Sequence, residues 1–275
     1  MMSDMLAHAF ESSCMLELQA LKPGNVHVFS DGHGMSVNDF VLSAKAVSNV
    51  ISRPDLSLGK RVLLSVEATQ AAVGCNTNLG IILLCAPIIQ AKLDGRNENL
   101  QSRLHRILLE TTIEDARDVF QAIRLANPGG LGQSQQYDVN QVTECSLLDA
   151  MYVASERDLI AAQYAKDFAD IFENGLMTYL GAIQRYNRAW ATTILHLSWM
   201  ANYLDSHVLR KHGHQVATSL RVEAKMYLQK LLAMPNPKQY QKTLLLWDAE
   251  LKGKRINPGT SADMTVASLF LADIV

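Results

Sequence analysis

The sequence predicts an all-α fold, a single multi-helix globular domain over residues 1–275 with roughly ten to twelve helices. Apolar residues recur at three- and four-residue spacings along most of the chain, no segment alternates polar and apolar residues, and prolines fall mainly between the apolar segments. Hydrophobic residues make up 48% of the chain, which is enough to bury a sizeable core.

Helical spacing is clearest in residues 6–20, 40–51 and 113–123, where apolar side chains fall on one face. The longest apolar run, residues 79–91, contains Pro87 and Gln90 and predicts a buried core helix, because a membrane span needs about 20 apolar residues. Three helix starts carry a capping-box pattern with Asp as its acid: Ser36 and Asp39, Thr112 and Asp115, Thr260 and Asp263.

Composition excludes several function classes. The formal net charge is −2 with no long run of one sign, so no nucleic-acid partner is expected. The four cysteines lack a CxxC pair, which is typical of free thiols in a reducing compartment, and Cys75 has no nearby base that would make it a nucleophile. No apolar signal core follows a basic N-terminus, so we expect a cytoplasmic protein without a membrane partner.

Three junctions rich in Asn, Pro and Gly, residues 21–27, 74–87 and 257–263, combine small polar side chains with the start of an apolar segment. Amide and hydroxyl groups at the lip of a core can hold a polar ligand while water is excluded. In the first junction, Pro23 biases Lys22 away from helix and Gly24 permits a sharp turn, so the ammonium group can project toward an anion. The alternative is a solvated lysine at a helix end.

Charged residues near these junctions are further candidates. Glu67 follows Val66 in an apolar stretch, so a partly desolvated carboxylate that binds Mg²⁺ or accepts a proton is one interpretation, and an exposed helix face is the other. The segment 204–214 gathers an acid, an Arg–Lys pair suited to phosphate, and three histidines before and after Gly213, although a charged helix end explains it equally.

Two features keep two interpretations each. Asp263 is either a helix cap or a metal or hydroxyl ligand at the start of the last apolar helix. The stretch 127–141 holds three glycines and four glutamines, and it is either a binding loop or lid or a surface connector.

Taken in order, Lys22–Asn25, Asn76–Gly80 and Asn257–Asp263 resemble the three signature segments of the triphosphoribosyl-dephospho-CoA synthase family, over nearly the whole chain. The resemblance implies a helical fold and transfer of a triphosphoribosyl group from ATP to 3'-dephospho-CoA with release of adenine, a step in prosthetic-group biosynthesis. The citrate-lyase branch reads Asn-Thr-His-Lys-Gly in the second segment, whereas this chain has Asn78 and Leu79, and it is more similar to archaeal and methylotroph members.

The leading hypothesis is therefore an ATP-dependent, Mg²⁺-dependent pentosyltransferase. Carboxylates would bind Mg²⁺, and one of them, Glu67, would accept the proton of the attacking hydroxyl; cations would neutralise the triphosphate, and polar junction residues would orient ribose and base. The carboxylates are Glu67, Asp205 and Asp263, the cations Lys22, Arg210 and Lys211, and the junction residues Gly24, Asn25, Thr69, Asn76, Thr77, Asn78 and Gly80.

Two alternatives differ in class. One is a related nucleotide-dependent step in the biosynthesis of a one-carbon carrier cofactor, recognised by release of ADP or AMP in place of adenine. The other is a non-catalytic helical scaffold that binds a nucleotide or a carrier protein, which would be favoured if the three junctions were scattered over the molecule. A homodimer is compatible with the sequence.

Overall fold

A computed structural model of the chain describes residues 2–129, 136–141 and 143–275. Its described part is 73% helical and without strands, which confirms the all-α prediction. The elements are α1 (Met2–Gln19), α2 (Val37–Ile51), α3 (Leu58–Val73), α4 (Leu79–Leu93), α5 (Leu100–Leu109), α6 (Ile113–Ala126), α7 (Leu147–Ala154), α8 (Leu159–Ala165), the π-helix η1 (Asp170–Leu176), α9 (Met177–Ile183), α10 (Arg188–Asn202), α11 (Ser206–Ala233), the 3₁₀ helix η2 (Pro237–Tyr240), α12 (Gln241–Gly253) and α13 (Gly259–Ile274). The thirteen α-helices of this part slightly exceed the expected number, because short helices such as α8 span too few turns to show a periodic pattern.

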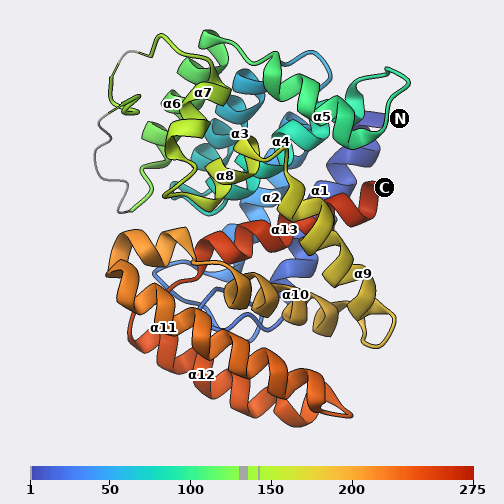
Figure 1. Cartoon of the computed structure of the whole chain (residues 1–275), viewed down its shortest axis with the longest axis vertical. Coiled ribbons are helices and arrows are strands. Elements are labelled where there is room, and N and C mark those ends of the chain that lie inside the picture. Colours follow the sequence, from blue (N-terminus) through green and yellow to red (C-terminus); the bar gives the residue numbers. More distant parts are fainter. Residues whose placement is uncertain (1, 130–135, 142) are drawn as a thin grey trace.

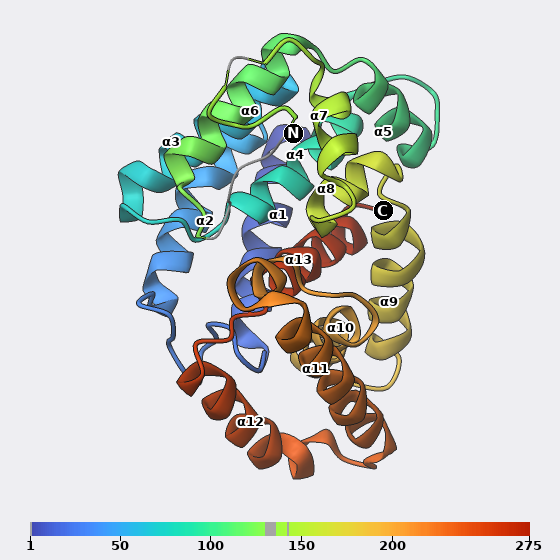
Figure 2. The ribbon, with the colours of Figure 1, turned by 60° about the vertical axis from the view of Figure 1, so that its left-hand side comes forward.

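The last helix lies at the centre of the molecule. Figure 1 shows α3, α6 and α7 toward one end, α11 and α12 toward the other, and α13 between them, and the turned view in Figure 2 keeps this order. Helix α13 packs against α1, α4, α10 and η1. Because both of its sides meet other helices, twelve of its sixteen residues are buried.

The predicted core helix over residues 79–91 is confirmed as α4, in which every residue from Leu79 to Ile89 is buried. Pro87 stands inside this helix, where it cannot donate a bond to the carbonyl of Leu83 four residues earlier. The hydroxyl of buried Tyr164 donates a 2.7 Å hydrogen bond to that carbonyl. Helix α8 thus satisfies a polar group that the sequence of α4 would leave unpaired in the core.

Two of the three predicted capping boxes are present. Ser36 caps α2 with Asp39, and Thr112 caps α6 with Asp115, each with the reciprocal pair of bonds. The third prediction is wrong, because α13 begins at Gly259 after Pro258 and has no side-chain cap. No helix of the described chain is both long and apolar enough to cross a membrane.

Candidate active site

A cavity of about 400 Å³ opens between the two halves of the molecule, a size typical of small-molecule sites. All three polar junctions contribute to its wall, through Asn25, the stretch 76–80, and Asn257, Gly259, Thr260, Ala262 and Asp263. The remaining wall is largely apolar and comes from α2, α4, α6, α7 and α8: Phe40, Leu83, Phe120, Ile123, Ala150, Met151, Ala154, Ile160 and Ala161. Segments more than 200 residues apart therefore meet at one site, which counts against a scatter of unrelated junctions.

The first junction folds as a β-turn over Lys22 to Asn25. The Asn25 amide donates a 3.0 Å bond to the Lys22 carbonyl, and Gly24 has a φ of 84°. Proline followed by a residue with positive φ is typical of a type II turn, which explains the Pro-Gly sequence. A β-carbon on Gly24 would also lie 2.8 Å from a ring carbon of Pro258, so this turn fits directly against the third junction.

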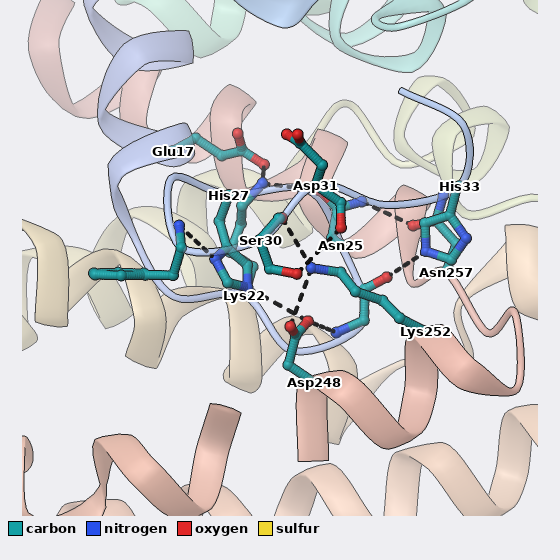
Figure 3. A network of polar contacts seen from close by, with 12 residues as sticks. Glu17, Lys22, Asn25, His27, Ser30, Asp31, His33, Asp248, Lys252 and Asn257 are labelled. Carbon is teal, nitrogen blue, oxygen red and sulfur yellow. Dashed lines mark hydrogen bonds and ion pairs between the residues drawn. The ribbon is translucent and has the colours of Figure 1, made fainter. Parts of the chain in front are cut away.

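Lys22 does not project toward an anion, contrary to the expectation from sequence. Its side chain is fully buried and does not line the cavity. The ammonium group forms an ion pair with Glu17 and a 2.9 Å hydrogen bond with Oδ1 of Asn25, and the Asn25 amide nitrogen then donates to Oδ1 of Asn257 at 2.8 Å (Figure 3). Lys22 therefore positions Glu17 and Asn25, which do line the cavity, instead of meeting a ligand itself.

A second group of contacts anchors the loop that follows this turn (Figure 3). Asp248 of α12 accepts a 2.8 Å bond from the Gly24 amide and lies 3.4 Å from Nε2 of His27. Lys252 reaches both Asp248, at 3.1 Å, and the carbonyl of Ser30, at 3.0 Å. Helix α12 thus fixes the loop from outside the cavity and keeps the first junction in place.

The second junction places its polar side chains at the start of α4. Asn78 is buried, its Oδ1 accepts a 2.9 Å bond from Thr69, and its Nδ2 has no partner among the described residues. Thr77 donates to Ser43 at 2.7 Å, and Oδ1 of Asn76 accepts from the Leu79 amide at 3.1 Å. Thr69 lies outside the cavity wall and acts on it through Asn78, whereas the residues from Asn76 to Gly80 line the wall.

Asp263 is the most strongly perturbed carboxyl of the cavity wall. Burial raises its pKa well above the usual value, and the nearby carboxylates of Asp205, Glu17 and Asp158 raise it further. Gly80 makes room for it, because a β-carbon there would lie 2.1 Å from Oδ2 of Asp263. Asp263 does not cap α13. A half-buried acid that serves no cap and faces a cavity is typical of a functional residue.

Asp205 has a structural position instead of the predicted metal-binding one. Its Oδ1 accepts a 3.0 Å bond from the Val208 amide, and its Oδ2 accepts two 2.8 Å bonds from the amide and hydroxyl of Ser261. Asp205 is buried outside the cavity wall. The carboxylate therefore caps α11 and joins its first turn to that of α13, and these bonds use most of its acceptor capacity.

Glu67 is not desolvated, and here the sequence interpretation is wrong. It lies on the exposed face of α3 and does not line the cavity. Its apolar sequence neighbour Val66 is buried, but adjacent residues of a helix point about 100° apart. Glu67 is therefore on the face that the sequence analysis named as the alternative.

The side chains of Arg210 and Lys211 lie in different surroundings. Arg210 lines the cavity and binds Asp158 at 2.5 Å, while its Nε is buried without a partner among the described residues. Lys211 is exposed, and its side chain lies over Gly129 beside the cavity. The predicted helix end at Gly213 is present as a break inside α11, where Gly213 has a φ of 82°.

Two carboxyls of the cavity wall, Glu17 and Asp158, were not predicted from the sequence. Glu17 continues the stripe Leu6, Phe10 and Ser13 on the buried face of α1, and an acid on such a stripe is the signal that could have identified it. Asp158 caps α8 through the amides of Ile160 and Ala161, and this local role hid its place at the cavity. Of the loop 127–141, residues 130–135 lie outside the described residues, while Pro128 and residues 137–139 line the cavity.

Within the described chain, no group of three His, Cys, Asp or Glu side chains is arranged to hold a metal ion by itself. Mg²⁺ seldom needs such a cage, because it is usually bound by one or two carboxylates together with substrate phosphates. Asp263, half-buried at the wall and free of any hydrogen bond from the described residues, fits that requirement.

Comparison with known proteins decides the family. The model of the CitG family, described as ATP:dephospho-CoA triphosphoribosyl transferase, matches residues 3–275. The chain belongs to this family. Membership indicates a transferase that moves the triphosphoribosyl group of ATP to dephospho-CoA in prosthetic-group biosynthesis, as the resemblance of the three junctions implied.

A solved structure supports the fold assignment. A crystal structure from Archaeoglobus fulgidus, of a protein provisionally named triphosphoribosyl-dephospho-CoA synthase, matches with a TM-score of 0.65 and 23% identity. The match covers 86% of this chain and 97% of that chain, and at this identity it shows the shared fold alone. No curated protein matches the sequence.

Proposed function

We propose that the cavity between α4, α8, α11 and α13 is the site of the family's reaction, and that ATP and dephospho-CoA meet there. The observation that carries this proposal is the convergence of the three junctions on one wall beside the half-buried carboxyl of Asp263, whose pKa is strongly raised. The apolar wall of α6 and α7 suits a base, and the polar wall suits ribose and phosphate groups.

The reaction exchanges one bond at C1' of the ATP ribose. A hydroxyl oxygen of dephospho-CoA forms a bond to C1', the bond from C1' to the adenine nitrogen breaks, and adenine leaves with the electron pair and takes up a proton. The hydroxyl proton passes to a base. Because C1' develops positive charge, carboxylates held near it stabilise the transition state more than the ground state.

The carboxyls of the cavity divide into two roles in this proposal. Asp263 would hold Mg²⁺ on the triphosphate, where the ion neutralises phosphate charge. Arg210 would add a fixed positive charge on the same side. Glu17, which lines the cavity with its pKa raised by burial, would take the proton of the attacking hydroxyl in place of Glu67.

The unpaired amide of Asn78 supports a role in binding the nucleotide. Its Oδ1 is bonded to Thr69, so its Nδ2 is available for a ligand acceptor. Asn25 and Asn76 lie on the same wall and would orient ribose hydroxyls. These contacts position the donor, and positioning supplies much of the rate acceleration in a two-substrate transfer.

Incubation with ATP, Mg²⁺ and dephospho-CoA tests the proposal. We expect free adenine and a product heavier than dephospho-CoA by one triphosphoribosyl group, both read by mass spectrometry. Release of ADP or AMP would favour the one-carbon cofactor alternative, and nucleotide binding without turnover would favour the scaffold.

A matched pair of variants locates the reaction. Asp263→Asn removes a charge from the cavity wall, whereas Glu67→Gln removes one from the exposed face of α3. We expect adenine release to fall at least about a hundredfold in the first and to stay near the wild-type rate in the second. The reverse result would move the site to α3. A homodimer and a cytoplasmic location stay predictions, which gel filtration and cell fractionation test.

A further inference from the structure

Beside the cavity, three histidines and a lysine from two distant segments gather at its rim. His207 and Lys211 come from the first turns of α11, His212 follows them, and His33 comes from the loop after the first junction. We call His33, His207, Lys211 and His212 the rim cluster. Of these four residues, the sequence suggested a role only for Lys211, as a cation for the triphosphate, and only His207 lines the cavity itself.

Backbone contacts hold the rim cluster against the junctions. Nε2 of His33 lies 2.7 Å from the Gly24 carbonyl, and Nε2 of His212 lies 3.1 Å from the carbonyl of Arg255. The His207 amide donates to Thr260 at 3.2 Å, and its ring lies beside Gly259 of the third junction. These bonds fix the cluster at the site, so it is not a chance group of surface side chains.

The cluster lacks a partner for its charge and for one buried nitrogen. Lys211 forms no ion pair with any described residue, and Nε2 of His207 is buried without a hydrogen bond within the described chain. Burial, and after it the cations of Lys211 and Arg210, lower the pKa of His207 to about 4. Positive charge is concentrated here, and one buried ring nitrogen has no partner. We therefore expect the cluster to bind an anion, which would neutralise the charge and accept a hydrogen bond from that nitrogen.

We propose that the rim cluster binds the diphosphate of the acceptor, dephospho-CoA, while the triphosphate of ATP lies deeper against the carboxylates. The inference rests on the proposed function of the cavity. The inner wall carries Glu17, Asp158 and Asp263, so a polyphosphate there needs Mg²⁺. None of the four residues of the rim cluster is acidic, so the cluster can hold a diphosphate by charge and N–H groups alone.

The covalent structure of the acceptor agrees with this placement. Its diphosphate is joined through the 5' carbon to the adenosine ribose, so a diphosphate at the rim brings the ribose hydroxyls into the cavity toward C1' of ATP. The pantetheine arm leaves from the other phosphate and passes outward beside the exposed Lys211. The reacting end of the acceptor is thus enclosed, and the end that does not react stays in solvent.

Binding measurements on the full chain test the assignment without requiring turnover. Titration calorimetry would follow dephospho-CoA, inorganic pyrophosphate, and ATP with Mg²⁺ binding to wild type and Lys211→Ala. We expect Lys211→Ala to weaken dephospho-CoA and pyrophosphate about tenfold each and to leave ATP with Mg²⁺ within about twofold, since one charged contact to a phosphate is lost. Lys230→Ala, an exposed lysine near the other end of α11 that has no ion pair among the described residues, is the matched control and should bind all three as wild type does.

Two outcomes would overturn the proposal. A loss of ATP affinity in Lys211→Ala as large as the loss for dephospho-CoA would assign the rim to the triphosphate of the donor. Unchanged binding of all three ligands would remove the cluster from substrate recognition.

Failure of wild type to release adenine would overturn the proposed function alone, because the affinities of the rim variants are measured independently. His207→Gln, which keeps a hydrogen-bonding group but not the ring, should weaken dephospho-CoA and spare ATP with Mg²⁺ in the same way.

Discussion

Replacement of Asp263 by Asn separates a functional carboxylate from a structural one. The two side chains have nearly the same shape, so Asn fits the space that Gly80 leaves open beside it. If Asp263 acts through its charge on the triphosphate, the variant loses one electrostatic contact in the transition state. Such a loss typically slows a reaction at least about a hundredfold, which corresponds to about 2.7 kcal/mol of activation free energy.

The same substitution should raise the free energy of unfolding although it slows the reaction. Burial, and then the nearby carboxylates, raise the pKa of Asp263, so the folded protein binds a proton there more tightly than the unfolded chain does. The free energy of unfolding of wild type must then fall as pH rises from about 4, the unfolded pKa, up to the raised folded pKa. Each pH unit inside this window costs wild type about 1.4 kcal/mol relative to Asn, which does not titrate.

The assay combines adenine release with urea denaturation at pH 5 and pH 8, the latter in EDTA so that no cation lowers the pKa of Asp263. We expect Asp263→Asn to be slow at both pH values, and at least as stable as wild type at pH 8, with a gain that is larger at pH 8 than at pH 5. Near-normal turnover together with lower stability would refute the reasoning, because it would show that the carboxylate supports the fold and not the reaction.

Three further substitutions test the packing around the site. Tyr164→Phe should lower the free energy of unfolding by about 1–3 kcal/mol, since it leaves a buried carbonyl of α4 unpaired; in urea denaturation, addition of Pro87→Ala should recover part of the loss, and no recovery would contradict the pairing. Lys22→Met should destabilise the protein by roughly 3–5 kcal/mol because Glu17 stays buried without its cation, and a double variant with Glu17→Gln that is no more stable would count against this reason. Gly80→Ala should retain its helical circular dichroism but release adenine at least about tenfold more slowly, because the added methyl would lie 2.1 Å from a carboxylate oxygen of α13; an unchanged rate would show that this carboxylate can move freely.

The fold class was predictable because helical periodicity is a local property of the chain. The buried run that became α4, and the capping pairs at Ser36 and Thr112, depend on residues at most a few positions apart. The capping pattern at Thr260 failed for a tertiary reason, since the Thr260 hydroxyl accepts a bond from α11 instead of capping its own helix.

The candidate site was predictable only where small polar residues stand next to an apolar segment. Asn76 to Gly80 line the cavity because the start of a buried helix must lie at the edge of the core. Lys22 and Glu67 could not be placed in this way, because the sequence does not state which partner or which face a charged side chain meets. The role of Glu17, five residues before Lys22, becomes clear only from the ion pair between them.

By itself the sequence determined the helices, the buried α4 and the three junctions that identify the family. Only the tertiary structure decided which carboxyls face the cavity, because their roles depend on contacts between segments far apart in the chain. Asp205 accepts hydrogen bonds from the start of α13, 56 residues later, whereas Asp263 faces the cavity beside Gly80. Burial and like charges then perturb a carboxyl that the local pattern had presented as an ordinary helix cap.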